Sequence, residues 1–235
     1  MENFCYFFVS LFSALISVFF FFPFLRPVLD LSVSKNKNQN LWDRLFHATR
    51  GIDVYLVGAI FYPFVDLAQL HLSQLIFASM GHGISFLSIK IFSAFVTGAV
   101  SAIFFNPFKV ALIRMQKQKD ESFFVALKNI IQKQGIGALY SGSFFFSIRN
   151  AFYATSLFQI SNLIPNFFYF SCFLAALFSI FFTLPLDYFS SESILNRKAK
   201  HGIKYWYFGF TNRFSAHLCE FLAFNYFKTQ LSQYC

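Results

Sequence analysis

The sequence predicts an all-α membrane protein, with six transmembrane helices arranged as three pseudo-symmetric helix hairpins. Composition, six long apolar segments and a threefold repeat of motifs predict this fold. Hydrophobic residues make up 57% of the 235 residues, charged residues 12%, and forty residues are Phe. In an ordinary soluble domain, hydrophobic residues make up roughly 45–50% and charged residues roughly 25%. A soluble globule of this size cannot bury so much apolar surface, so the composition excludes a cytosolic enzyme, a disordered chain and a soluble nucleic-acid-binding protein.

Six segments are long enough to cross a bilayer, which takes about 20 apolar residues in a helix. The N-terminal segment Met1–Leu25 is apolar, but it carries Glu2 and no basic leader, and no small-x-small cleavage site follows it. The first span is therefore predicted to be a transmembrane helix rather than a cleaved signal peptide. In order, the predicted spans are approximately 3–30, 52–79, 83–116, 140–162, 166–193 and 206–231.

The basic residues gather in the three long loops that follow the first, third and fifth spans. These loops, together with Arg114 at the end of the third span, contain thirteen of the nineteen Lys and Arg residues, whereas the short connections at 80–82 and 163–165 contain none. This bias predicts that the three long loops lie on one side of the membrane and both termini on the other. In the second long loop, Phe123, Leu127 and Ile130 share one helical face, which predicts an amphipathic surface helix.

Motifs recur at fixed offsets in three segments, which are predicted to be repeats within one transmembrane domain: residues 1–80, 81–163 and 164–235. Each repeat has a proline deep in its odd-numbered span, where it removes a backbone hydrogen bond and is predicted to kink the helix. Small residues stand thirteen and nine positions before each proline, a spacing that lets membrane helices approach closely. The sets are Pro23 with Ser10 and Ala14, Pro107 with Ala94 and Gly98, and Pro185 with Cys172 and Ala176.

A glycine motif precedes each even-numbered span. It reads Gly-x4-(Leu or Tyr)-x-Gly, and it runs over 51–58, 135–142 and 202–209. The proline and the first glycine of a repeat are 28 residues apart in the first two repeats and 17 apart in the third. The basic loop of the third repeat is therefore predicted to be shorter.

These motifs resemble the mitochondrial carrier family, most closely from Ser93 to Phe158. The resemblance rests on PFKVALIRMQ at Pro107–Gln116, on QGIGALYSG at Gln134–Gly142 and on Arg149. The third repeat matches through Pro185-Leu186-Asp187 and Tyr207-Phe208-Gly209, and the first mainly through Pro23, Gly51 and Gly58. The resemblance implies transport of a small metabolite across the inner mitochondrial membrane by alternating access, with no enzymatic activity.

The family closes its matrix side with ion pairs, and this sequence retains few of them. In the family, an acid two residues after each proline pairs with a base five residues after the next proline. The residues two positions after the prolines are Leu25, Lys109 and Asp187 here. The residues five positions after them are Val28, Leu112 and Ser190. Lys109 with Asp187 is thus the one pair expected in this matrix gate, to which Arg114 and Gln116 also belong by resemblance. The cytoplasmic gate motif, aromatic-(Asp/Glu)-x-x-(Lys/Arg), has no match near Ala78, Asn162 or Thr229.

The family's substrate contacts lie on the even helices, seven and eight residues after the second glycine. Arg149 followed by Asn150 at these positions is similar to carriers of keto acids and dicarboxylates. An Arg side chain binds a carboxylate with two parallel hydrogen bonds, which agrees with an anionic substrate. Asp66 occupies the matching position on the second helix, where it would balance an amino group or neutralise Arg149. His217, on the sixth helix, would couple a proton or would be a hydrogen-bonded packing residue.

Other charged and glycine positions leave alternatives open. Arg213 and Glu220 are seven residues apart and share a face of the sixth helix, so each is expected to line the cavity or to be paired. The glycines that open the even helices hold cardiolipin phosphates in the family, because helix N-termini bind anions. The matching residues here are Gly142 and Gly209 with Tyr140 and Tyr207. The alternative for these glycines is a tight turn alone.

The sequence contains no metal cluster, nucleophile or Gly-rich nucleotide loop that indicates an enzyme. We therefore expect no metal and no cofactor beyond structural cardiolipin. The expected partners are a small anionic substrate and membrane lipids, with no nucleic acid, around a monomer. An alternative keeps the fold without transport, as in degenerate carrier relatives of the outer mitochondrial membrane that act as insertases or membrane-dynamics scaffolds. A third is an unrelated six-span protein with similar motifs.

Overall fold

The computed structural model describes residues 5, 7–15, 52–80, 85–117, 123–196, 202, 206–207 and 210–233. In this part of the chain every regular element is a helix, and residues 7–15 are helical as well. The α-helices are α3 (Ile52–Met80), α4 (Phe86–Lys117), α5 (Phe123–Gln134), α6 (Ser143–Phe158), α7 (Phe168–Ile194) and α9 (Phe210–Ser232). Short 3₁₀ helices are η2 (Ile136–Tyr140), η3 (Ile160–Asn162) and η4 (Pro165–Phe167).

These helices fall where the sequence predicts apolar spans, with one correction. The predicted span 140–162 is not one helix: α6 occupies its middle, with η2 before it and η3 after it. A break occurs at Gly142, whose φ of 71° is left-handed and interrupts helical geometry before α6. Phe86–Arg114 and Phe168–Ile194 are long and apolar enough to cross a membrane. The count of six spans and the arrangement in three hairpins remain predictions.

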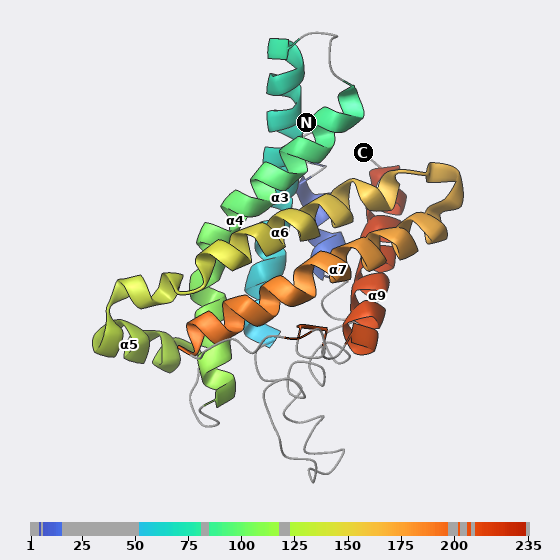
Figure 1. Cartoon of the computed structure of the whole chain (residues 1–235). Helices are drawn as coiled ribbons and strands as arrows, with labels where there is room; N and C mark the ends of the chain where they lie inside the picture. The colour runs from blue at the N-terminus through green and yellow to red at the C-terminus, as the bar shows by residue number, and fades with distance from the viewer. Residues whose placement is uncertain are drawn as a thin grey trace.

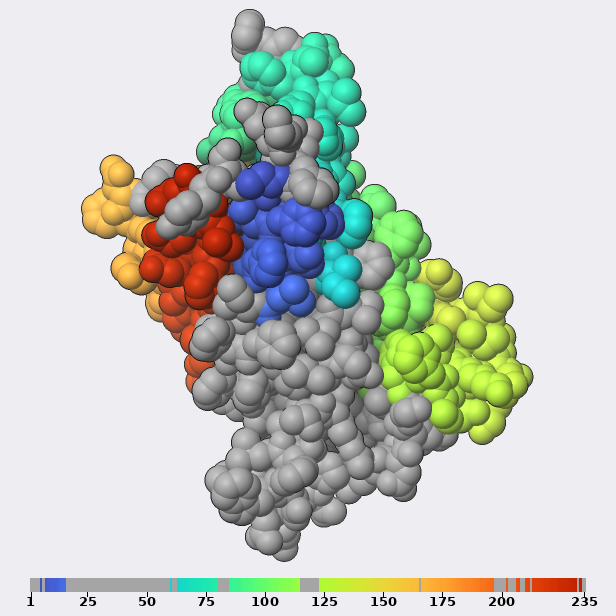
Figure 2. All heavy atoms as spheres, turned by 180° about the vertical axis from the view of Figure 1, so that it is seen from behind, coloured from blue at the N-terminus to red at the C-terminus, as the bar shows by residue number. Residues whose placement is uncertain are grey.

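Consecutive helices pack side by side through the described part of the chain. α3 packs on α4, α4 on α6, α6 on α7, and α7 on α9 (Figure 1). Residues 7–15 lie between α9 and α3 on the opposite face (Figure 2). Ala14 joins a buried apolar cluster with Cys172 and Phe221, and Ser10 Oγ donates a hydrogen bond of 3.2 Å to Asp66. The first and last described helical segments are therefore neighbours.

The small residues upstream of the prolines are all buried. Ser10, Ala14, Ala94, Gly98, Cys172 and Ala176 lie in the interior, whereas large aromatic side chains such as Phe92, Phe104 and Phe170 are exposed. Small residues inside and large apolar residues outside are typical of helices that pack in lipid. Pro107 and Pro185 lie inside α4 and α7, and Pro23 lies outside the described residues.

The amphipathic loop helix is present as α5, at Phe123–Gln134. Phe123 and Ile130 are buried on one face, where they pack with Val110 of α4 and Ile194 of α7. Lys133 is exposed at the end of the helix. The second loop therefore folds back onto the ends of α4 and α7.

Gly142→Ala should lower the free energy of unfolding by about 2 kcal/mol, because a non-Gly residue with left-handed φ costs about 1–2 kcal/mol and a methyl group here has no room. The added Cβ would lie 2.7 Å from the Ser190 backbone oxygen of α7. Gly135→Ala is the matched control, since Gly135 has φ 78° and nothing within 4 Å of an added Cβ. Unfolding by SDS titration in mixed micelles measures both variants. Equal losses in the two would contradict a close contact at Gly142.

Candidate functional site

Side chains from four helices meet at the carboxylate of Asp187. Lys109 of α4 places Nζ 2.9 Å from Oδ1 of Asp187 on α7. Arg213 of α9 and Arg149 of α6 both contact Oδ2, at 2.6 Å and 3.4 Å. The four side chains, which we call the Asp187 cluster, are between 12% and 19% exposed.

The position of Asp187 in the sequence explains part of this meeting. Asp187 and Lys109 each stand two residues after the proline of their helix, so the repeat places them at the same depth of α7 and α4. The pair expected from this spacing is formed, with a second hydrogen bond of 3.1 Å from Lys109 Nζ to Ser190 Oγ. The two arginines come from the even helices and add charge that this spacing does not predict.

The cluster contains more positive than negative groups, with three cations against one carboxylate among the residues named. A charge inside a membrane protein is costly, so further contacts are needed. Arg149 Nη1 donates a 3.1 Å hydrogen bond to Asn150 Oδ1, and its guanidinium lies 4.8 Å from the Tyr153 ring centroid. Lys109 Nζ lies 4.1 Å from the Phe146 ring centroid. These ring contacts stabilise cations where water is scarce.

Asp66 lies in a second cluster, apart from the first. Its Oδ2 accepts a 2.6 Å hydrogen bond from Lys228 Nζ of α9 and one from Ser10, and the side chain is 2% exposed. We call Asp66, Lys228 and Ser10 the Asp66 cluster. In the structure Asp66 does not form the pair with Arg149 that the sequence suggested. Asp66 pairs with Lys228 of α9, and Arg149 pairs with Asp187.

Lys228 is a charged residue that the family motifs do not predict. It follows Phe224 and Asn225 with the spacing of the cytoplasmic gate motif, but Asn225 stands in the place of the acid, so the motif with Asp or Glu has no match here. Asn225 Oδ1 accepts a 3.1 Å hydrogen bond from Asn162 Nδ2, which links α9 to the end of η3. Arg213 and Asn225 are twelve residues apart, about 18 Å along a helix. The Asp187 cluster, which contains Arg213, and the Asp66 cluster, whose Lys228 lies one turn beyond Asn225, are therefore well separated along α9. We call them the two polar layers.

His217 is a buried packing residue in this structure. Its Nδ1 lies 3.0 Å from Ser179 Oγ, and its ring meets the Tyr153 ring edge to face at 5.4 Å. The residue is 4% exposed. These contacts fit the hydrogen-bonded packing role rather than an open position in a cavity.

The remaining predicted residues belong to the matrix gate and to the cardiolipin-binding turns. Arg114 is half-buried near the end of α4, and the Gln116 side chain and Gly209 lie outside the described residues. Tyr140 is exposed, and Tyr207 donates a 3.0 Å hydrogen bond to the Phe181 carbonyl. Within the described ranges no group of three or more His, Cys, Asp or Glu side chains could hold a metal.

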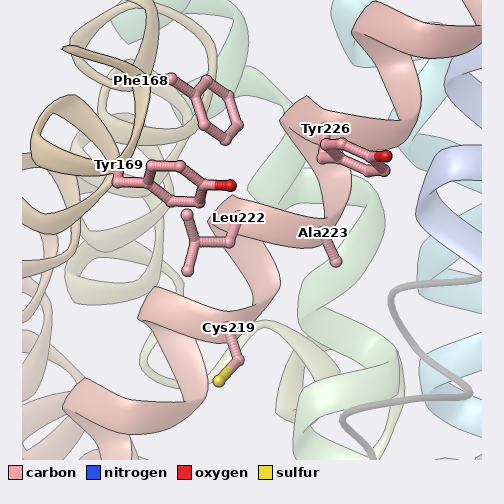
Figure 3. Close-up of a pocket in the computed structure, with 6 residues that line it drawn as sticks. All are labelled: Phe168, Tyr169, Cys219, Leu222, Ala223 and Tyr226. Carbon is pink, nitrogen blue, oxygen red and sulfur yellow. The ribbon is translucent and has the colours of Figure 1, made fainter.

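A groove on the outer surface is distinct from these clusters. Its volume is about 280 Å³, and it lies between the start of α7 and the second half of α9 (Figure 3). Tyr169 and Tyr226 at the groove are exposed, as expected of a surface that faces lipid. None of the predicted substrate contacts lines it. The lining residues are Phe168, Tyr169, Cys219, Leu222, Ala223 and Tyr226.

Residues 85–172 match the family model described as "Mitochondrial carrier protein". No curated protein matches the chain. The matched range contains α4, α5 and α6 and includes the stretch Ser93–Phe158 on which the resemblance was strongest. The resemblance to the mitochondrial carrier family is thus confirmed over this range. Members of this family are transporters rather than enzymes, and the similarity of this chain to them covers residues 85–172.

Proposed function

On the premise of a mitochondrial carrier segment at residues 85–172, we propose that the protein transports a small carboxylate across the inner mitochondrial membrane, with Arg149 and Asn150 as principal contacts. The observation that carries this proposal is the position of Arg149. Its guanidinium lies in the middle of a short helix, is only partly exposed, and already contacts a carboxylate, that of Asp187. A guanidinium in this setting binds carboxylates strongly and with defined geometry.

The charges around Arg149 favour an anion over a cation or an amino acid. Lys109 and Arg213 lie at the same carboxylate, so three cations contact Asp187 among the described residues. Asp66, the residue that would balance an amino group, is instead buried with Lys228 and Ser10. A substrate amino group therefore has no counter-charge at Asp66, which supports a substrate with carboxylates alone.

The two polar layers support alternating access. The Asp187 cluster connects α4, α6, α7 and α9, and the Asp66 cluster connects α3, α9 and residues 7–15. Access from either side requires the layer on that side to open while the other holds. Lys109, Asp187, Arg114 and Gln116 form the matrix gate in this proposal. The protein acts as a monomer, with cardiolipin at the turns of Gly142 and Gly209 beside Tyr140 and Tyr207.

A ligand screen tests this function. The purified full chain is heated with keto acids, dicarboxylates, amino acids and nucleotides, and its unfolding temperature is recorded. A ligand that binds the folded protein alone stabilises it by about 2.7 kcal/mol at a hundredfold excess over its dissociation constant. We expect a shift with carboxylates, lost in Arg149→Ala and kept in Lys133→Ala, whose side chain is exposed at the end of α5. A well-folded protein that responds to no metabolite would contradict transport and favour the scaffold or insertase alternative.

A further inference from the structure

Two arginines from different helices share one oxygen of Asp187. Arg213 of α9 lies 2.6 Å and Arg149 of α6 lies 3.4 Å from Oδ2, whereas Lys109 contacts Oδ1. The two guanidinium groups thus form a site that holds a carboxylate oxygen, and the carboxylate in it belongs to α7. Guanidinium groups donate charge-assisted hydrogen bonds to carboxylates, and two such groups converge here.

We propose that Asp187 is an internal competitor for the substrate, and that the carboxylates of the substrate displace it from Arg149 and Arg213. This inference rests on the proposed function, because it concerns the same site. It assigns Arg213 to substrate binding beside Arg149. It also makes the empty state of the carrier one in which its own carboxylate fills the substrate position.

Displacement is feasible because Asp187 keeps a partner. Lys109 contacts the other oxygen, Oδ1, and is itself held by Ser190 Oγ at 3.1 Å. When the arginines turn to the substrate, the Asp187 charge therefore remains paired with an ammonium group. A buried charge left without a partner would be strongly unfavourable, and this arrangement avoids that state.

The number of guanidinium groups at Asp187 indicates the class of substrate. Among the described residues, Arg149 and Arg213 both contact the Asp187 carboxylate, and Lys109 remains its partner when they turn to the ligand. Two guanidinium groups on two helices suit an anion with two carboxylates, one for each arginine. A dicarboxylate should therefore bind more tightly than a monocarboxylate of the same carbon number.

Calorimetric titration of the full chain in detergent tests this inference, with succinate and butyrate as a pair of four-carbon probes. Asp187→Asn should raise the affinity for succinate on the order of tenfold, within the usual range for coupled sites. Glu192→Gln is the matched control, since Glu192 lies on the same helix outside the cluster and loses the same charge. It should leave the affinity unchanged. The double variant Asp187→Asn/Arg213→Gln should lose the gain.

The outcomes separate this inference from the proposed function. An Asp187→Asn protein that folds and binds succinate no better than the wild type contradicts the inference, as does an equal gain in Glu192→Gln. If Asp187→Asn does not fold, Arg213→Gln decides: it should weaken succinate binding on its own, and wild-type affinity would overturn the assignment. Binding that depends on Arg149 but on neither Asp187 nor Arg213 overturns the inference alone. Absence of carboxylate binding in the wild type overturns both.

Discussion

Replacement of Lys228 by Met should lower the free energy of unfolding by about 3–5 kcal/mol, the range expected when one partner of a buried ion pair is removed. Asp66 is 2% exposed and lies 2.6 Å from Lys228 Nζ. The variant leaves this carboxylate in an apolar interior with the Ser10 hydroxyl as a much weaker partner. SDS titration of the full chain in mixed micelles measures the loss.

A double variant and a matched control make this result specific. Asp66→Asn/Lys228→Met should recover most of the stability, because no buried charge remains to be compensated. Lys133→Met removes an exposed lysine at the end of α5 and should change stability by less than about 0.5 kcal/mol. A Lys228→Met protein as stable as Lys133→Met would contradict a stabilising buried ion pair between α9 and α3.

Gly98→Val should cost about 3 kcal/mol, at the upper end of the cost of overpacking a close contact. An added Cβ would lie 2.6 Å from the Asn150 backbone oxygen and 2.7 Å from Ala154 Cβ, both on α6. Neither group is a flexible side chain, so α4 and α6 would have to separate. Arg149 precedes Asn150, and the same movement should weaken carboxylate binding.

Gly137→Val is the control for this prediction. Gly137 lies in η2, and an added Cβ there meets nothing within 4 Å. Both variants are measured by SDS titration and by the thermal shift with a carboxylate. The close α4–α6 contact would be refuted if Gly98→Val unfolded at the same SDS concentration as Gly137→Val.

The repeat motifs predicted much of the fold because they act locally. Small residues at fixed distances before Pro107 and Pro185 specified which face of each odd helix is buried, and they are buried. The spacing from those prolines also brought Lys109 and Asp187 together. The 3₁₀ helices η2 and η3 on either side of α6 were not predicted, because apolar composition does not distinguish an α-helix from a short tight turn.

Contacts between helices far apart in the chain were harder to predict. Lys228 and Asp66 are 162 residues apart, and their pairing depends on how α9 is placed relative to α3. Arg213 was placed on a helical face, but its reach to Asp187 depends on the register of α9 against α7. Periodicity gives the face of a helix and not its register against a neighbour, so the partner of a charged residue cannot be predicted from it.

Uptake of succinate into lipid vesicles containing the purified full chain tests the central claim, carboxylate transport through Arg149. The account predicts uptake of labelled succinate by the wild type and by Lys133→Ala. It also predicts a fall of about tenfold or more in Arg149→Ala, since a hydrogen bond to a charged group contributes about 1.5–3 kcal/mol. Folded wild-type protein that takes up no carboxylate, or Arg149→Ala vesicles that take up succinate as fast as the wild type, would contradict it.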